Sequence, residues 1–104
     1  MEEMVNQKEL NDEEIYDLSD FFKVLGDSTR LKLLYCLDKN EMTVTELCNK
    51  LGMTKSAVSH QLKVLKDNKL VNYRKKGKNA IYELDDEHIS TIIETAEIHL
   101  KERN

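Results

Sequence analysis

The sequence predicts an α+β fold that is mostly α, and three observations lead to that prediction. Residues 43–67 hold two short helical patterns with a glycine between them. Residues 70–84 then change to a strand–turn–strand pattern around the run KKGKN. Apolar residues recur with helical spacing on both sides, over residues 12–25 and 86–103. Two helices joined by a tight turn and followed by a β-hairpin constitute a winged helix-turn-helix.

The turn between the two central helices has clear local signals. Leu47 and Leu51 lie four residues apart and share one face of the first helix. Gly52 follows at once, where the chain needs a positive φ that glycine adopts cheaply. Thr54 can cap the next helix with its hydroxyl oxygen. The buried stripe of that second helix is predicted to be Val58, Leu62 and Leu65.

The flanking segments complete a single domain over residues 12–104, after a flexible segment at residues 1–11. We expect a first helix from about Asp12 to Leu25, ended by Gly26. It has more apolar surface than one small core needs, so we interpret it as a dimerisation helix. Ser28 is expected to cap the next helix. The residues expected to face the core from that helix are Leu31, Leu34 and Leu37.

The charges of the chain are strongly segregated. Residues 54–78 hold eight lysine or arginine residues and only one carboxylate, Asp67, which gives this segment a charge of +7. The other residues hold 8 basic and 19 acidic side chains, or −11, so the total is −4. An acidic body with one basic face concentrates positive potential where a polyanion would dock. We therefore expect double-stranded DNA as a partner.

The predicted second helix presents an outward face without any carboxylate, as a DNA groove requires. The hairpin that follows has a basic tip, which can reach phosphate or a minor groove. Lysine and arginine are expected to meet phosphates, and the uncharged polar residues to meet base edges. The candidate DNA-binding residues are Lys55, Ser56, Ser59, His60, Gln61, Lys63, Arg74, Lys75 and Lys78. The alternative for the helix is an ordinary helical hairpin with a solvated polar face.

Other classes of protein are less consistent with the sequence. No apolar run approaches the ~18 residues of a membrane span, and the acidic start MEEMVNQKEL is unlike a signal peptide. Cys36 and Cys48 form no CxxC pair and are interpreted as reduced thiols of a cytoplasmic protein. We find no HExxH motif, phosphate-binding glycine loop or set of nucleophile, histidine and acid. We expect neither an enzyme nor a small organic substrate.

The last predicted helix carries four residues of a possible metal site, Asp86 and His88 at its start and His99 and Glu102 at its end. Eleven residues at 1.5 Å each separate the two histidines by roughly 16 Å along the axis, too far for one ion. If two such helices pack antiparallel across a twofold axis, the start of one meets the end of the other. A dimer would then hold two closed sites of nitrogen and oxygen ligands, which suit Zn²⁺, with Co²⁺ or Ni²⁺ as substitutes.

Simpler interpretations of these four residues stay open. Asp86 can be only a helix cap, and Glu102 only a solvated residue at a helix end. His88 and His99 can be exposed or interfacial histidines without a metal. In that case the chain is a winged-helix regulator without metal control, responsive to redox change at Cys36 or to a partner protein.

From about Asp12 to Glu102 the chain resembles the ArsR/SmtB family of dimeric, metal-sensing winged-helix repressors. The segments that carry the resemblance are FFKVLGDSTRLKLLYCL, TELCNKLGMTKSAVSHQLKVLKDNKLV, and Asp86-x-His88 with His99-x-x-Glu102. One departure matters, because Lys50 stands where members that sense thiophilic metals have the second cysteine of an ELCxC box. Sensing of cadmium, lead or arsenite through that box is therefore not expected.

The resemblance implies an apo dimer that represses a metal efflux or detoxification gene and releases its operator when Zn²⁺ binds between the subunits. Metal held across both C-terminal helices would change the spacing of the two recognition helices, which must match half-sites about one helical turn apart. We further expect Gln61 to hydrogen-bond to the ring of His99 and so to join the metal site to the recognition helix.

Overall fold

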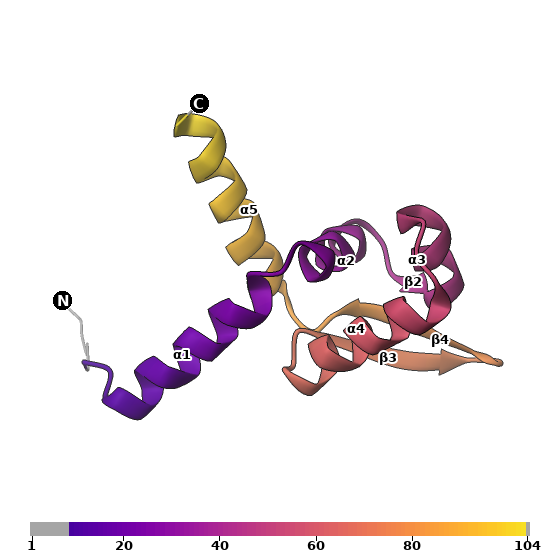
Figure 1. The fold of residues 1–104 in the computed structure, drawn as a ribbon, viewed down its shortest axis with the longest axis horizontal. Helices are drawn as coiled ribbons and strands as arrows, with labels where there is room; N and C mark the ends of the chain where they lie inside the picture. The colour runs from indigo at the N-terminus through magenta and orange to yellow at the C-terminus, as the bar shows by residue number, and fades with distance from the viewer. Residues whose placement is uncertain (1–8, 104) are drawn as a thin grey trace.

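The structure, a computed structural model, describes residues 9–103, so the flexible segment expected at residues 1–11 lies largely outside the described residues. Within residues 9–103 the chain forms five helices and one three-stranded antiparallel sheet (Figure 1), which confirms the predicted fold class. The elements in chain order are α1 (Asp12–Leu25), α2 (Ser28–Lys39), β2 (Met42–Thr43), α3 (Val44–Leu51), α4 (Lys55–Asp67), β3 (Val71–Lys76), β4 (Asn79–Leu84) and α5 (Glu87–Arg103).

One apolar core joins the middle of the chain. It lies where α2, α3 and α4 pack on one another and on the base of the β3–β4 hairpin. The predicted stripe of α4 is confirmed, because Val58, Leu62 and Leu65 are all fully buried. The other residues of the core are Leu25, Leu33, Leu34, Cys36, Leu37, Leu47, Leu70, Val71 and Ile89.

Helix α2 departs from the expectation in two ways. Its N-cap is Asp27 and not Ser28, because the Asp27 carboxylate accepts a hydrogen bond from the Arg30 amide at 3.0 Å. Its buried face is centred on Leu33 and Leu34, whereas Leu31 is 39% exposed. The prediction for Leu31 was wrong because the helix turns this residue away from the core and toward a groove beside α1 and α5.

Local capping fixes the helix-turn-helix. Thr43 and Glu46 form a capping box at the start of α3, in which each side chain accepts from the other residue's amide. Gly52 ends α3 with φ +65°, and its N–H donates to the carbonyl of Cys48 at 2.8 Å. The Thr54 hydroxyl accepts from the Ala57 amide at 3.1 Å and opens α4. The predicted positive φ at the glycine and the predicted threonine cap are confirmed.

The wing is the hairpin of β3 and β4, with a two-residue turn at Gly77 and Lys78. Gly77 has φ +64°, which glycine adopts without strain. Strand β4 lies at the centre of the sheet, because the short strand β2 pairs with its other edge. The sequence analysis did not predict β2, which is only two residues long. It ties the wing directly to the start of α3.

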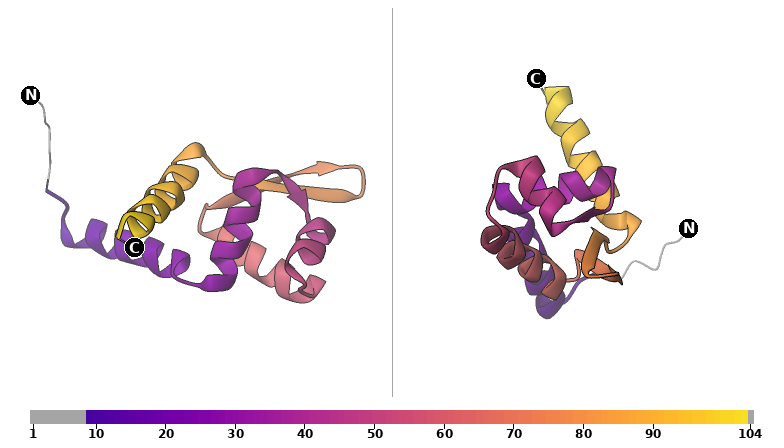
Figure 2. Two further views of the ribbon diagram at one scale, coloured as in Figure 1. Left: turned by 90° about the horizontal axis from the view of Figure 1, so that it is seen from above. Right: turned by 90° about the vertical axis from the view of Figure 1, so that its right-hand side faces the viewer.

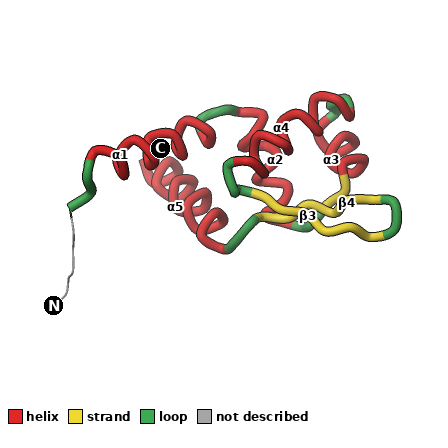
Figure 3. Tube along the Cα trace, turned by 90° about the horizontal axis from the view of Figure 1, so that it is seen from below, coloured by secondary structure: helices red, strands yellow, loops and turns green. Residues whose placement is uncertain are grey.

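Helices α1 and α5 extend from the end of the domain that lies farthest from the wing tip, and they diverge from each other (Figures 1 and 2). Figure 3, coloured by secondary structure, shows strands β3 and β4 alongside α2, α3 and α4, with the turn of the wing at the end of the molecule away from α1. Most of α1 is exposed, including Ile15, Tyr16, Leu18 and Phe22. Over residues 9–103, every helix is too short or too polar to cross a lipid bilayer.

We expect Gly52→Ala to destabilise the fold, because an alanine at φ +65° costs about 1–2 kcal/mol. No atom lies within 4 Å of the Cβ that the substitution adds, so the loss arises from backbone strain and not from a clash. Urea unfolding at one fixed protein concentration measures it. Gly52→Asn is the matched control and should lose less, because asparagine tolerates this conformation. Equal losses in the two variants would contradict the explanation.

Candidate functional site

The outward face of α4 is polar, basic and exposed. The five candidates on it that are exposed are Lys55, Ser56, Ser59, His60 and Lys63. They lie opposite the buried stripe, so the packing of α4 on the core directs them to solvent together. A helix with free donors, acceptors and positive charge on one face has the composition that the major groove accepts.

The wing tip and α4 border one hollow of about 270 Å³. Lys55 and Ser59 line it from α4, and Lys78 lines it from the turn of the wing. The start of α3 closes a third side with Thr43 and Thr45. Two lysines therefore face one depression from separate elements, although they are 23 residues apart in the sequence.

Two further basic candidates already have acidic partners. Lys63 Nζ lies 3.0 Å from Asp67 Oδ2 one turn along α4, and Arg74 Nη2 lies 2.6 Å from Glu41 Oε1. All four side chains are about half exposed or more, so each pair is of the kind that contributes little to stability. Lys75 is exposed on β3. The three basic side chains therefore remain available to a polyanion, which can replace the weakly held carboxylates.

Aromatic contacts fasten the base of the wing. The Tyr73 and Tyr82 rings lie 5.2 Å apart across β3 and β4, and Lys66 Nζ of α4 lies 5.6 Å from the Tyr73 ring centre. Burial, with a smaller contribution from Tyr73, raises the pKa of Tyr82 above its ordinary value. The phenol of Tyr82 therefore stays neutral and adds no negative charge beside the basic face.

Gln61 differs from the other candidates on α4. It is half-buried, and its Oε1 accepts a hydrogen bond from Arg30 Nε of α2 at 3.0 Å. Arg30 Nη1 also lies 3.4 Å from the Val24 carbonyl oxygen of α1. Within residues 9–103, Gln61 therefore bonds to Arg30, and no bond to His99 is formed. Sequence reasoning missed Arg30, because its partner is 31 residues away and no local spacing signals such a contact.

The four candidate metal ligands form two pairs at opposite ends of α5. Asp86 Oδ1 accepts from the His88 amide at 2.8 Å and lies 3.4 Å from His88 Nδ1. The side chain of His88 is 84% exposed, and His99 and Glu102 are exposed one helical turn apart. In the part of the chain that the structure describes, no three His, Cys, Asp or Glu residues come together as a metal site. One chain therefore brings Asp86 and His88 together and places His99 and Glu102 one turn apart at the other end, but it does not bring all four together.

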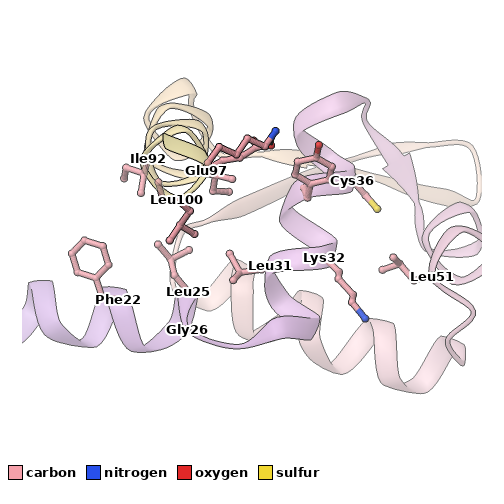
Figure 4. A pocket seen from close by; sticks show the side chains of 14 residues that line it. Phe22, Leu25, Gly26, Leu31, Lys32, Cys36, Leu51, Ile92, Glu97 and Leu100 are labelled. Atoms are coloured by element: carbon pink, nitrogen blue, oxygen red, sulfur yellow. Dashed lines mark ion pairs between the residues drawn. The ribbon is translucent and has the colours of Figure 1, made fainter. Parts of the chain in front are cut away.

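Beside α5 lies an apolar groove of about 760 Å³ (Figure 4). Helix α1 lines it with Phe22 and Leu25, α2 with Leu31, and α5 with Ile92 and Leu100. At its rim, Lys101 Nζ lies 2.9 Å from Glu97 Oε2. This hydrogen bond lowers the pKa of the Glu97 carboxyl and raises the pKa of Lys101.

The two cysteines are free thiols in different surroundings. Cys36 is buried on α2 and borders the apolar groove, whereas Cys48 is half-buried in α3, and its carbonyl accepts the N–H bond that ends this helix. Neither belongs to a metal-ligand cluster within residues 9–103.

Comparison with known proteins gives a consistent result. Residues 27–73 match the family described as "Bacterial regulatory protein, arsR family". The chain is 36% identical over 104 residues to a "Cadmium resistance transcriptional regulatory protein CadC homolog" of Staphylococcus aureus, with 97% of this chain and 86% of the relative covered. It is 38% identical over 85 residues to the "Transcriptional repressor SmtB homolog" of a Synechocystis strain, with 82% of this chain and 64% of the relative covered.

The fold has close counterparts among solved structures. A homodimeric winged helix-turn-helix DNA-binding domain, Mb0332 of Mycobacterium bovis, superposes with a TM-score of 0.83 at 23% identity, covering 96% of this chain and 93% of that one. At this identity the likeness concerns the fold alone. The chain spans a little under two thirds of the Synechocystis relative but most of the staphylococcal one, and both are regulators of transcription by name. The chain belongs to the ArsR family of bacterial regulatory proteins.

Proposed function

We propose that this chain is a homodimeric repressor that binds operator DNA and releases it when Zn²⁺ binds between the subunits, so that it controls metal efflux or resistance genes. The observation that carries the DNA-binding part is the hollow bordered by Lys55 and Ser59 of α4 and Lys78 of the wing. Both α4 and the wing present a lysine to this one depression. This arrangement suits a complex in which α4 enters the major groove and the wing follows the adjacent phosphate backbone.

The residues divide by chemistry between backbone and base contacts. Lys55, Lys63, Arg74, Lys75 and Lys78 are assigned to phosphates, where a positive charge acts without regard to sequence. The base-edge contacts are assigned to Ser56, Ser59, His60 and Gln61. While its oxygen stays bonded to Arg30, Gln61 keeps both donors of its NH₂ group for such a contact.

The ligand pairs of α5 fit an intersubunit metal site. Asp86 and His88 already lie 3.4 Å apart, and imidazole and carboxylate are ligands that Zn²⁺ takes in closed tetrahedral sites. His99 and Glu102 of the partner chain would supply the other two ligands, which gives two sites per dimer. A bound Zn²⁺ would join the start of one α5 to the end of the other. Related proteins are named for repression and for cadmium or arsenical resistance, which supports regulation by metal.

The dimer surface in this proposal is the exposed apolar side of α1 together with the groove beside α5. Phe22 is 54% exposed and Leu31 is 39% exposed, and both line that groove. Metal bound across this interface can weaken DNA binding by no more than a fixed amount of free energy. That amount is the difference between its binding to the DNA-free shape of the dimer and its binding to the DNA-bound shape. A change in the relative rotation of the α5 helices alters the spacing of the two α4 helices, and so the fit to two half-sites.

We expect Lys78→Gln to weaken binding to all duplex sequences about equally and to reduce the salt dependence of affinity by about one phosphate contact. Ser59→Ala should instead relax the sequence preference with a nearly unchanged salt slope. Fluorescence anisotropy at several salt concentrations measures both, on operators that the wild-type protein selects from a random duplex library. Lys39→Gln, at the far end of α2, controls for the loss of one charge. A flat salt response of the wild-type protein would exclude this surface.

We expect Zn²⁺ at one ion per protomer to lower operator affinity at least tenfold, about 1.4 kcal/mol of coupling. His99→Ala should abolish that effect. Because histidine ligands must be neutral and carboxylates ionised, zinc affinity should also fall in acid. If the zinc effect persists in both His88→Ala and His99→Ala, the α5 site is excluded. The alternative of redox or partner control would then explain the regulation.

Mixed dimers provide a sharper test of the intersubunit arrangement. A dimer of one His88→Ala chain and one His99→Ala chain retains one complete set of four ligands, whereas each homodimer of the variants retains none. We expect the mixed dimer, isolated with two different affinity tags, to regain one tight zinc site by competition against a chelator. The chain with both substitutions, mixed with itself, is the control. If mixing restores no site, the four ligands do not come together in the proposed way.

A further inference from the structure

One side chain, that of Arg30, connects three helices. It belongs to the first turn of α2, its Nε donates to Gln61 Oε1 of α4 at 3.0 Å, and its Nη1 lies 3.4 Å from the Val24 carbonyl oxygen of α1. Its own amide donates to the Asp27 carboxylate that caps α2, so the backbone that carries it is fixed as well. Within residues 9–103, no carboxylate lies within ion-pair distance of this guanidinium, so Gln61 and Val24 are its polar partners.

The contact between Arg30 and the Val24 carbonyl lies at the C-terminal end of α1. Val24 lies in the last turn of α1, where carbonyl oxygens lack partners within the helix and the helix dipole favours a cation. Helix α1 packs chiefly on α2 and has little direct contact with α4. The Arg30 side chain is therefore a polar route by which the position of α1 reaches the recognition helix.

We propose that Arg30 is a positioning residue for operator recognition, which holds recognition helix α4 in a fixed orientation to dimerisation helix α1 through Gln61. This inference rests on the proposed function, because it presumes that α4 binds the operator and that α1 belongs to the dimer interface. It adds a residue outside both the DNA-contact set and the metal-ligand set.

The chemistry of arginine suits this role. Its guanidinium is planar, always charged, and offers five N–H donors in fixed directions, so it can bond two acceptors on different helices. Lysine presents one flexible ammonium group and cannot reproduce that fixed geometry. The amide oxygen of Gln61 is directed to the inside of the domain by this bond. The bond therefore holds α4 at the middle of its length, next to the exposed Ser59 and His60.

The experiment separates positioning from a direct phosphate contact. The variants are Arg30→Met, Gln61→Met and the double substitution, with Arg30→Lys as the conservative change and Lys39→Met as the charge control on the same helix. Anisotropy measures the affinity of each dimer for the operator selected by the wild-type protein and for a random duplex of the same length, at several salt concentrations.

A positioning role predicts loss of specific binding only. Arg30→Met should lower operator affinity about tenfold, and the double variant should lose less affinity than the sum of the two single losses, because residues in contact couple. Affinity for random duplex should change no more than in Lys39→Met, since phosphate contacts govern it. Arg30→Lys should recover part of the lost affinity. If Arg30→Met lowers random-duplex affinity and the salt slope by about one contact, Arg30 binds phosphate and the proposal is overturned. Additive single losses also overturn it.

A second measurement does not depend on DNA or on the folding of Arg30→Met. The side-chain Nε–H of Arg30 should exchange with water more slowly than that of the exposed Arg103 in ¹⁵N NMR of the free wild-type dimer. Gln61→Met should remove this protection. Equal exchange of the two arginines in the wild-type protein overturns the proposal. If the wild-type protein selects no operator at all, the proposed function fails together with this inference. If it selects one and the double-variant test is additive, only the inference fails.

Discussion

Val58, Leu62 and Leu65 are fully buried beneath α4, and this one packed stripe decides where each polar residue of the helix points. Complete burial of such a side chain contributes about 1.5–3 kcal/mol, so rotation of the helix about its axis would cost several times that amount. Lys55, Ser59 and their neighbours are therefore held on the outside by the core and not by contacts of their own. The orientation of α4 is also set by its connection to α3. The caps at Thr43 and Thr54 and the positive φ of Gly52 fix the angle at which α4 meets the core.

The same arrangement reconciles a net charge of −4 with a polyanion as the ligand. The net positive charge is concentrated in residues 54–78 of α4 and the wing, while most of the carboxylates are spread over the other elements. The two ion pairs within the basic face, Lys63 with Asp67 and Arg74 with Glu41, are exposed and weak. Exchange of such a partner for phosphate costs little. The acidic remainder also limits indiscriminate binding to nucleic acid, because it repels a polyanion from every other side.

Much of this fold could be predicted because its signals are local. Gly52 and Thr54 act within one turn of their own positions, and a heptad-like stripe such as that of α4 follows from helical spacing alone. The failures concern partners that are distant in sequence. Leu31 has the same local spacing as Leu34, yet the packing of α1 and α5 leaves a groove on its side of α2. Strand β2 exists only because β4 lies beside it, and the bond between Arg30 and Gln61 spans 31 positions.

The candidate metal ligands and the apolar groove both lie along α5, and in the proposed dimer both are completed by a second chain. Two ligands at each end of a 17-residue helix cannot converge, and an apolar groove open to water is unfavourable until a partner covers it. An ion that bridges two copies of α5 would therefore stabilise the dimer by mass action, in addition to any effect on its shape. Release of DNA needs more than that stabilisation, since a tighter dimer in an unchanged shape would bind its operator more strongly. In the proposed mechanism a rotation of α5 has to reach α4. Helix α5 packs on the wing strand β4 and lines one groove with α1 and α2. In the proposed mechanism, a route from metal to DNA can therefore pass through the wing, through the core that Ile89 of α5 shares with α4, or through the α1–α2 corner that Arg30 connects to the recognition helix.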